Sequence, residues 1–140
     1  MNKTSLQTIY EQQKTFFDSG KTLQYPFRLA ALLRLEKALN AHEDALIKAL
    51  NADLKKSAFE SYSAEIGLIK TEIRFAKRRL KKWMRPRKQR DVLINFPSKN
   101  YHIPVPYGLS LIIGPWNYPV QLCLSPLIGA IAAGNTVLLK

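Results

Sequence analysis

Apolar side chains recur at spacings of three and four residues through the first half of the chain, and this pattern predicts amphipathic helices. A first helix is expected over residues 5–19, with Ser5 as its cap and Gly20 as its stop. The clearest stripe predicts a later helix that ends before Pro86, because proline disfavours helical geometry in the residue that precedes it. The apolar positions of that stripe are Ile66, Ile69, Ile73, Ala76, Leu80 and Trp83.

Between these two helices, another apolar stripe starts near Pro26 and ends near residues 51–53. Its spacing fits one long helix or two helices joined near residues 40–42, and the pattern does not choose between them. His42 falls on the stripe, so we expect its side chain to pack against neighbouring apolar residues.

The pattern then changes from helical to extended. Residues 91–96 and 100–108 each predict an extended segment. Pro104 and Pro106 have no N–H to donate, so the second segment is expected at the edge of a sheet or outside the main sheet.

The last part of the chain predicts a strand over residues 109–113, a helix over residues 119–133 and a strand over residues 136–139. Both strands lack polar alternation, which is typical of a parallel sheet that is covered on both faces. The helix is apolar nearly all round, so we expect it to be buried, and Pro126 should kink or divide it. Gly134 is a suitable stop. These elements indicate the α/β class.

The loop between this strand and this helix has the most distinctive sequence of the chain, Gly-Pro-Trp-Asn-Tyr-Pro at residues 114–119. Ligands of open α/β sheets bind outside the carboxyl ends of the strands, and Asn117 falls at such an end. Pro115 and Pro119 each fix a backbone φ angle, so the loop is a rigid mount for a neutral hydrogen-bond donor. Taken alone, an Asn between prolines is also typical of a plain turn.

Residues 111–119 resemble the Pro-Trp-Asn-aromatic-Pro signature of the NAD(P)-dependent aldehyde dehydrogenases. The sequence Ala-Ala-Gly-Asn-Thr-Val-Leu-Leu-Lys at residues 132–140 is similar to the next conserved block of that family. Residues 53–57 and 59–67 resemble its class 3-like branch. The resemblance covers about residues 25–140, which is most of the chain.

The resemblance implies the N-terminal part of the aldehyde dehydrogenase fold. Residues 1–90 would form the helical part of the cofactor-binding domain, residues 91–107 extended segments of the oligomerisation ribbon, and residues 108–140 the first strand-helix-strand unit of a Rossmann-like sheet. The implied reaction oxidises an aldehyde to a carboxylic acid through a cysteine thiohemiacetal, with NAD or NADP as cofactor, in a homo-oligomer. The sequence stops at Lys140, before the family's nucleophilic cysteine and general-base glutamate, so we expect this chain to be inactive without a complementing C-terminal chain.

The resemblance also implies roles for individual residues. The side-chain amide of Asn117 would help to form an oxyanion hole, where losing one donor typically costs about 10²–10³ in rate. Lys140 would contact the adenosine ribose of NAD(P). Four residues would line the cofactor cleft through apolar or backbone contacts: Ile113, Gly114, Pro115 and Trp116.

Charge allows an alternative function. The chain has 22 Lys and Arg against 10 Asp and Glu, for a formal net charge of +12. Either an acidic remainder balances this charge, or the chain is a basic helical module that binds nucleic acid or anionic surfaces. The basic run consists of Arg74, Lys77, Arg78, Arg79, Lys81, Lys82, Arg85, Arg87, Lys88 and Arg90. Trp83 is its one aromatic residue, and no helix-turn-helix or zinc pattern accompanies it, so we do not expect nucleic-acid binding.

Cys123 lies between two leucines of the apolar helix without a His or acid beside it, so we predict a buried, inert thiol and not a nucleophile. His42 and His102 lie far apart in the sequence, with no Cys or acid at metal-ligand spacing, so we assign no metal. The single cysteine excludes an intramolecular disulfide, which is typical of reducing compartments.

The beginning of the sequence has no signal-peptide pattern. The apolar run at residues 120–133 is too short to span a bilayer. We therefore expect a cytoplasmic protein. The preferred aldehyde, the choice between NAD and NADP, and the oligomeric state stay open.

Overall fold

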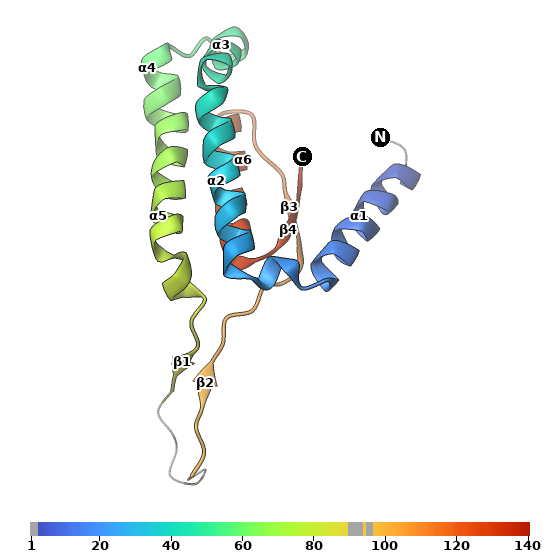
Figure 1. Ribbon diagram of the computed structural model, residues 1–140. Helices are drawn as coiled ribbons and strands as arrows, with labels where there is room; N and C mark the ends of the chain where they lie inside the picture. Colours follow the sequence, from blue (N-terminus) through green and yellow to red (C-terminus); the bar gives the residue numbers. More distant parts are fainter. Residues whose placement is uncertain (1–2, 90–93, 95–96) are drawn as a thin grey trace.

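The structure is a computed structural model that describes residues 3–89, 94 and 97–140 of the chain. Its helices are α1 (Lys3–Asp18), the short 3-10 helix η1 (Lys21–Leu23), α2 (Tyr25–Ala41), α3 (Glu43–Leu54), α4 (Ala58–Ser61), the π-helix η2 (Tyr62–Ile66), α5 (Gly67–Trp83) and α6 (Pro119–Ala133). Its strands are β1 (Arg87–Lys88), β2 (Tyr101–His102), β3 (Leu109–Ile112) and β4 (Thr136–Leu139). Figure 1 shows their arrangement.

The first two apolar stripes fold as three helices. Helix α1 begins at Lys3, so Ser5 lies inside the helix and is not its cap. Gly20 follows α1 in the left-handed region, at φ 73°. The second stripe forms two helices, α2 and α3, which meet at His42. His42 is exposed, and the expectation that it packs was wrong, because α2 ends one residue before it and the stripe changes direction there.

The third stripe belongs to a longer helical segment than predicted. Helical geometry begins at α4, where the Ser57 hydroxyl accepts a 3.1 Å hydrogen bond from the Glu60 N–H, and continues through η2 into α5. The predicted apolar positions from Ile66 to Leu80 are buried. They meet residues of α2 and α6, and the shared core contains Leu32, Leu39, Ile66, Ile69, Ile73, Ala76, Leu80, Ile128 and Ala132. In Figure 1, α2 and α5 run side by side in front of α6.

The predicted strand-helix-strand unit is present. Strands β3 and β4 pair in parallel, with Leu109 opposite Thr136 and Ile112 opposite Leu139. Figure 1 shows the two strands between α6 and α1, and both helices contact them. Helix α6 ends at Gly134, whose φ of 94° is left-handed, as expected for a helix stop.

One expectation for α6 was wrong and another is resolved in part. The helix is continuous through Pro126, so of the two effects predicted for this proline, a kink or a division, the division does not occur. The helix is also not buried all round: only Ile128 and Ala132 are buried along it. The reason is that α2, α5 and the two strands cover one side, while residues such as Pro126 and Gly129 face outward.

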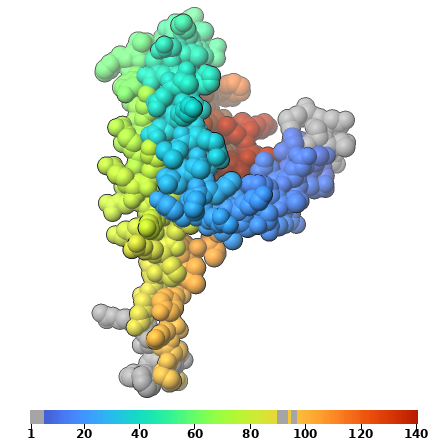
Figure 2. Space-filling model, in the orientation of Figure 1, coloured from blue at the N-terminus to red at the C-terminus, as the bar shows by residue number. Residues whose placement is uncertain are grey.

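A two-stranded ribbon lies apart from this unit. Strand β1, which the sequence did not predict, pairs antiparallel with β2, and Arg87 lies opposite His102. The ribbon forms its own sheet, as expected for a segment that contains Pro104 and Pro106. It protrudes from the body of the molecule in Figure 2. Of the predicted extended segment at residues 91–96, only Ile94 lies within the part of the chain that the structure describes.

Candidate functional site

Asn117 lies in the loop that joins the carboxyl end of β3 to the N-terminus of α6, as predicted. The residue is exposed, and among the residues that the structure describes none hydrogen-bonds to its side-chain amide. Its backbone is held: the carbonyl oxygen accepts a 2.9 Å hydrogen bond from Nζ of Lys56. A fixed backbone with an unengaged amide is what a ligand-facing donor requires.

The candidate cofactor residues meet at the same edge of the sheet. The Gly114 N–H donates to the Lys140 carbonyl oxygen at 3.0 Å, and the Lys140 N–H donates to the Ile112 carbonyl oxygen at 2.9 Å. These bonds continue the parallel ladder past the last residues of β3 and β4, so Ile113, Gly114 and Lys140 lie side by side. Ile113 is 66% exposed and Trp116 is 88% exposed.

Gly114 is also a point of close packing. A Cβ atom at this position would overlap Sγ of Cys123 on α6, so glycine lets the loop approach the helix. Cys123 is half-buried, and not fully buried as predicted. Its sulfur faces backbone, and no His or acid is hydrogen-bonded to it among the described residues, which supports a packing role.

Two residues that the sequence did not single out hold this loop. Lys56 and Glu65 form a buried ion pair, with Nζ and Oε1 2.6 Å apart. Glu65 is fully buried and Lys56 is 7% exposed. The second Glu65 oxygen, Oε2, accepts hydrogen bonds from backbone N–H groups in the first turn of α6. The one signal in the sequence was an acid directly beside the apolar stripe that starts at Ile66.

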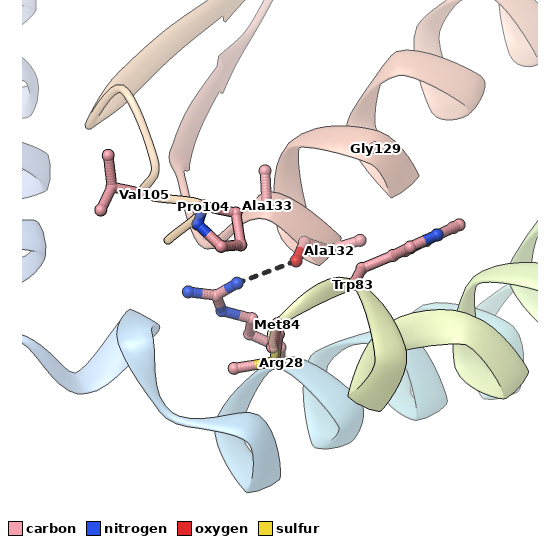
Figure 3. Close-up of a pocket in the computed structure, with 8 residues that line it drawn as sticks. All are labelled: Arg28, Trp83, Met84, Pro104, Val105, Gly129, Ala132 and Ala133. Atoms are coloured by element: carbon pink, nitrogen blue, oxygen red, sulfur yellow. Dashed lines mark hydrogen bonds between the residues drawn. The ribbon is translucent and has the colours of Figure 1, made fainter. Parts of the chain in front are cut away.

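A cavity of about 310 Å³ lies at the other end of α6, away from Asn117. Figure 3 shows its lining: Arg28, Trp83, Met84, Pro104, Val105, Gly129, Ala132 and Ala133. Arg28 donates from Nε to the Thr22 carbonyl oxygen at 2.7 Å and from Nη1 to the Ala132 carbonyl oxygen at 3.0 Å. Burial lowers the pKa of the Arg28 guanidinium, which still stays protonated near neutral pH. The lining of the cavity is therefore mostly apolar. Its charged residue, Arg28, makes its hydrogen bonds to carbonyl oxygens of the chain itself.

The basic face of α5 is partly neutralised within the fold. Lys70 pairs with Glu43 of α3, and Lys77 pairs with Glu36 of α2. These pairs fasten α5 to the two preceding helices. Within the basic run that starts at Arg74, Lys77 thus serves the packing of the helices and is not free to bind a polyanion.

Within residues 3–89, 94 and 97–140, no three His, Cys, Asp or Glu side chains gather as a metal site would require. No helix in that part of the chain is long and apolar enough to cross a membrane.

A sequence model of the Aldehyde dehydrogenase family matches residues 1–140, the whole chain. The chain belongs to the aldehyde dehydrogenase family. It is 42% identical over 134 residues to the 4,4'-diaponeurosporen-aldehyde dehydrogenase of Staphylococcus aureus, covering 96% of this chain and 29% of the relative. It is 42% identical over 136 residues to aldehyde dehydrogenase family 3 member B1 of Rattus norvegicus, covering 97% of this chain and 29% of that protein.

Solved aldehyde dehydrogenase structures agree with this assignment. The substrate-bound state of Staphylococcus aureus AldH matches with a TM-score of 0.95 at 41% identity, covering 100% of this chain and 30% of that structure. The Streptococcus pyogenes succinic semialdehyde dehydrogenase in complex with NADP+ matches with a TM-score of 0.85 over 100% of this chain and 30% of its own. At 17% identity, that likeness concerns the fold alone.

These findings confirm the class 3-like resemblance and the predicted α/β fold. This aldehyde dehydrogenase chain corresponds to the N-terminal portion of the family fold and spans about 30% of the length of the relatives that it matches. The segments around Lys56 and Glu65 are the ones whose sequence resembled the class 3-like branch.

Proposed function

We propose that this chain supplies the oxyanion-hole donor and part of the cofactor cleft of an enzyme that oxidises aldehydes to carboxylic acids. The observation that carries the proposal is the Asn117 side-chain amide, which is exposed and unengaged at the carboxyl end of β3 while its backbone is held by Lys56. In the reaction, a cysteine thiolate adds to the aldehyde carbon and negative charge develops on the oxygen. A neutral amide N–H at a fixed position stabilises that charge without itself titrating.

Cys123 is not the proposed thiolate, because its sulfur packs against the backbone of Gly114. We assign the nucleophile and the general base to the portion of the family fold that these 140 residues do not span.

The carboxyl edge of β3 and β4 fits NAD or NADP. Ile113 and Trp116 expose apolar surface there, and Lys140 is exposed at the end of β4 beside Gly114, where an ammonium can donate to ribose hydroxyls. We propose that these residues, together with Gly114 and Pro115, line the cleft. The bound cofactor would supply the oxidant of the reaction.

We propose that the ribbon, the preceding helices and the strand-helix-strand unit have separate roles in a cytoplasmic homo-oligomer. The ribbon of β1 and β2, which protrudes in Figure 2, would take part in homo-oligomerisation. The helices that precede the ribbon would belong to the cofactor-binding domain, together with the strand-helix-strand unit that follows the ribbon. The protein would work in the cytoplasm, where a chain with a single cysteine needs no disulfide.

The proposal is tested by grafting residues 1–140 onto the remaining portion of the Staphylococcus aureus relative. We expect the graft to reduce NAD or NADP in the presence of short aliphatic, aromatic or long apolar aldehydes. Lys140→Ala should raise the KM for the cofactor with little change in kcat, whereas Lys48→Ala, an exposed lysine of α3, should change neither. A graft that folds, as judged by circular dichroism, but oxidises no aldehyde would contradict the proposal.

A further inference from the structure

The first turn of α6 takes its cap from a distant element. The N–H groups of Val120 and Gln121 donate to Oε2 of Glu65 at 2.9 and 3.1 Å. Pro119 has no N–H, and the Leu122 N–H bonds within the turn at 2.9 Å. The orphan donors of this helix end are therefore satisfied, and the carboxylate lies at the end of the helix dipole that favours negative charge.

The other oxygen of the same carboxylate holds Lys56, and Lys56 holds the Asn117 loop. Its ammonium donates to Glu65 Oε1 at 2.6 Å and to the Asn117 carbonyl oxygen at 2.9 Å, and it lies 3.8 Å from the ring centroid of Tyr118. The carbonyl oxygen of Lys56 in turn accepts a 2.9 Å hydrogen bond from Nδ2 of Asn51. One buried cation thus fixes the backbone of Asn117 and the ring that follows it.

The local fold explains why these two side chains meet. Lys55 is left-handed at φ 56°, so the chain turns sharply after α3 and directs Lys56 inward. The π-helix η2 places Glu65 and Ile66, two consecutive residues, both in the buried face. Single-turn π-helices are frequent at functional sites.

A buried ion pair is an expensive way to join two elements if only stability is at stake. Well-packed apolar side chains often do as well or better. Apolar residues here would leave the amides of Val120 and Gln121 and the carbonyl of Asn117 without partners, because these groups point at the pair. The pair therefore does something that apolar packing cannot: it sets the position of the loop relative to the helix.

We propose that Lys56 and Glu65 are positioning residues for the Asn117 amide. This inference rests on the proposed function of Asn117 as the oxyanion donor. The pair acts through the backbone: Glu65 fixes the start of α6, and Lys56 fixes the carbonyl of Asn117. Together they fix the backbone from which the Asn117 side-chain amide extends. A displacement of about 1 Å at a reacting centre can cost about 10²-fold in rate.

The test uses a variant that removes both charges and keeps the shapes, Lys56→Met with Glu65→Gln, in the grafted enzyme. Removing both partners avoids a lone buried charge, which could unfold the protein by itself. The matched control is Lys70→Met with Glu43→Gln, which removes the ion pair between α5 and α3. We expect the first double variant to lower kcat by about tenfold or more with the cofactor KM unchanged, and the control to change kcat less than about twofold.

A mutant cycle separates positioning from general damage. In an Asn117→Ala background, loss of the Lys56–Glu65 pair should lower kcat no further, because the group that it positions is gone. An equal, additive loss in both backgrounds would overturn the inference. If Asn117→Ala lowers kcat and the pair variant does not, the inference fails while the proposed function stands. If Asn117→Ala leaves kcat unchanged, the proposed function fails.

A second measurement decides the inference without any activity. In the 140-residue chain, the variant Lys56→Met with Glu65→Met leaves no acceptor for the amides of Val120 and Gln121. Hydrogen exchange at these two amides should quicken by about tenfold or more, while exchange in the α5 core around Ile69 and Ile73 stays unchanged. Unchanged exchange at both amides would show that the pair does not hold this loop and would overturn the inference.

Discussion

The guanidinium of Arg28 donates a 3.0 Å hydrogen bond to the carbonyl oxygen of Ala132, in the last turn of α6 (Figure 3). The opposite end of the same helix is bound by the carboxylate of Glu65. A cation at the C-terminus and an anion at the N-terminus both complement the helix dipole. Helix α6, which follows the Asn117 loop, is thus fixed at its two ends by charged side chains from α2 and η2.

Arg28→Met should lower the free energy of unfolding by about 2 kcal/mol or more. Methionine keeps much of the apolar stem, but the carbonyl oxygens of Thr22 and Ala132 lose their donor in a buried site. Arg34→Met, at an exposed position of the same helix, should change stability by less than about 0.5 kcal/mol. Urea denaturation followed by circular dichroism compares the two, and equal effects would refute the role given to Arg28.

Gly134→Ala should be more destabilising than Gly20→Ala. Both glycines have positive φ, at 94° and 73°, so alanine costs about 1 kcal/mol of backbone strain at each. At Gly134 the added Cβ would also overlap the guanidinium of Arg28, whereas at Gly20 it meets nothing within 4 Å. The difference between the two losses of stability, expected at about 1 kcal/mol or more, measures the crowding. If Gly134→Ala lowers stability no more than Gly20→Ala does, the Arg28 guanidinium moves aside freely, which would contradict the crowding.

Gly114→Ala should destabilise the chain by about 1–3 kcal/mol, because its methyl group would occupy the space of the Cys123 sulfur. Cys123→Ala removes that sulfur and should recover most of the loss, so the two substitutions are expected to be strongly non-additive in thermal melting. Simple additivity would mean that Gly114 is required for its backbone conformation and not for its contact with Cys123.

The βαβ unit and the Asn117 loop could be predicted because their signals are local. Continuous apolar runs marked β3, α6 and β4, and the prolines marked the loop between them. The burial of α6 was overestimated from the same runs, since composition reports how apolar a helix is but not how many neighbours cover it. His42 shows a related limit. An apolar stripe predicts which side chains are buried only as far as the helix continues, and α2 ends one residue before His42.

The groups that hold the loop could not be predicted from local pattern. Lys56 precedes Asn117 by 61 residues, and Glu65 precedes Val120 by 55 residues. Taken from the sequence alone, Lys56 beside Lys55 and Glu65 beside the apolar stripe are both typical of solvated charges. The packing of η2 against α6 brings them to the Asn117 loop. Arg28 is similar, since its bond to Ala132 spans 104 residues.

The central claim is that the Asn117 amide stabilises negative charge on the aldehyde oxygen, and one comparison of kcat tests it most directly. In the graft, Asn117→Ala should lower kcat by about 10²–10³, with the cofactor KM and the thermal midpoint unchanged. Asn40→Ala removes an exposed amide of α2, outside the loop, and should leave kcat unchanged. A kcat for Asn117→Ala within about twofold of the unsubstituted graft would contradict the account.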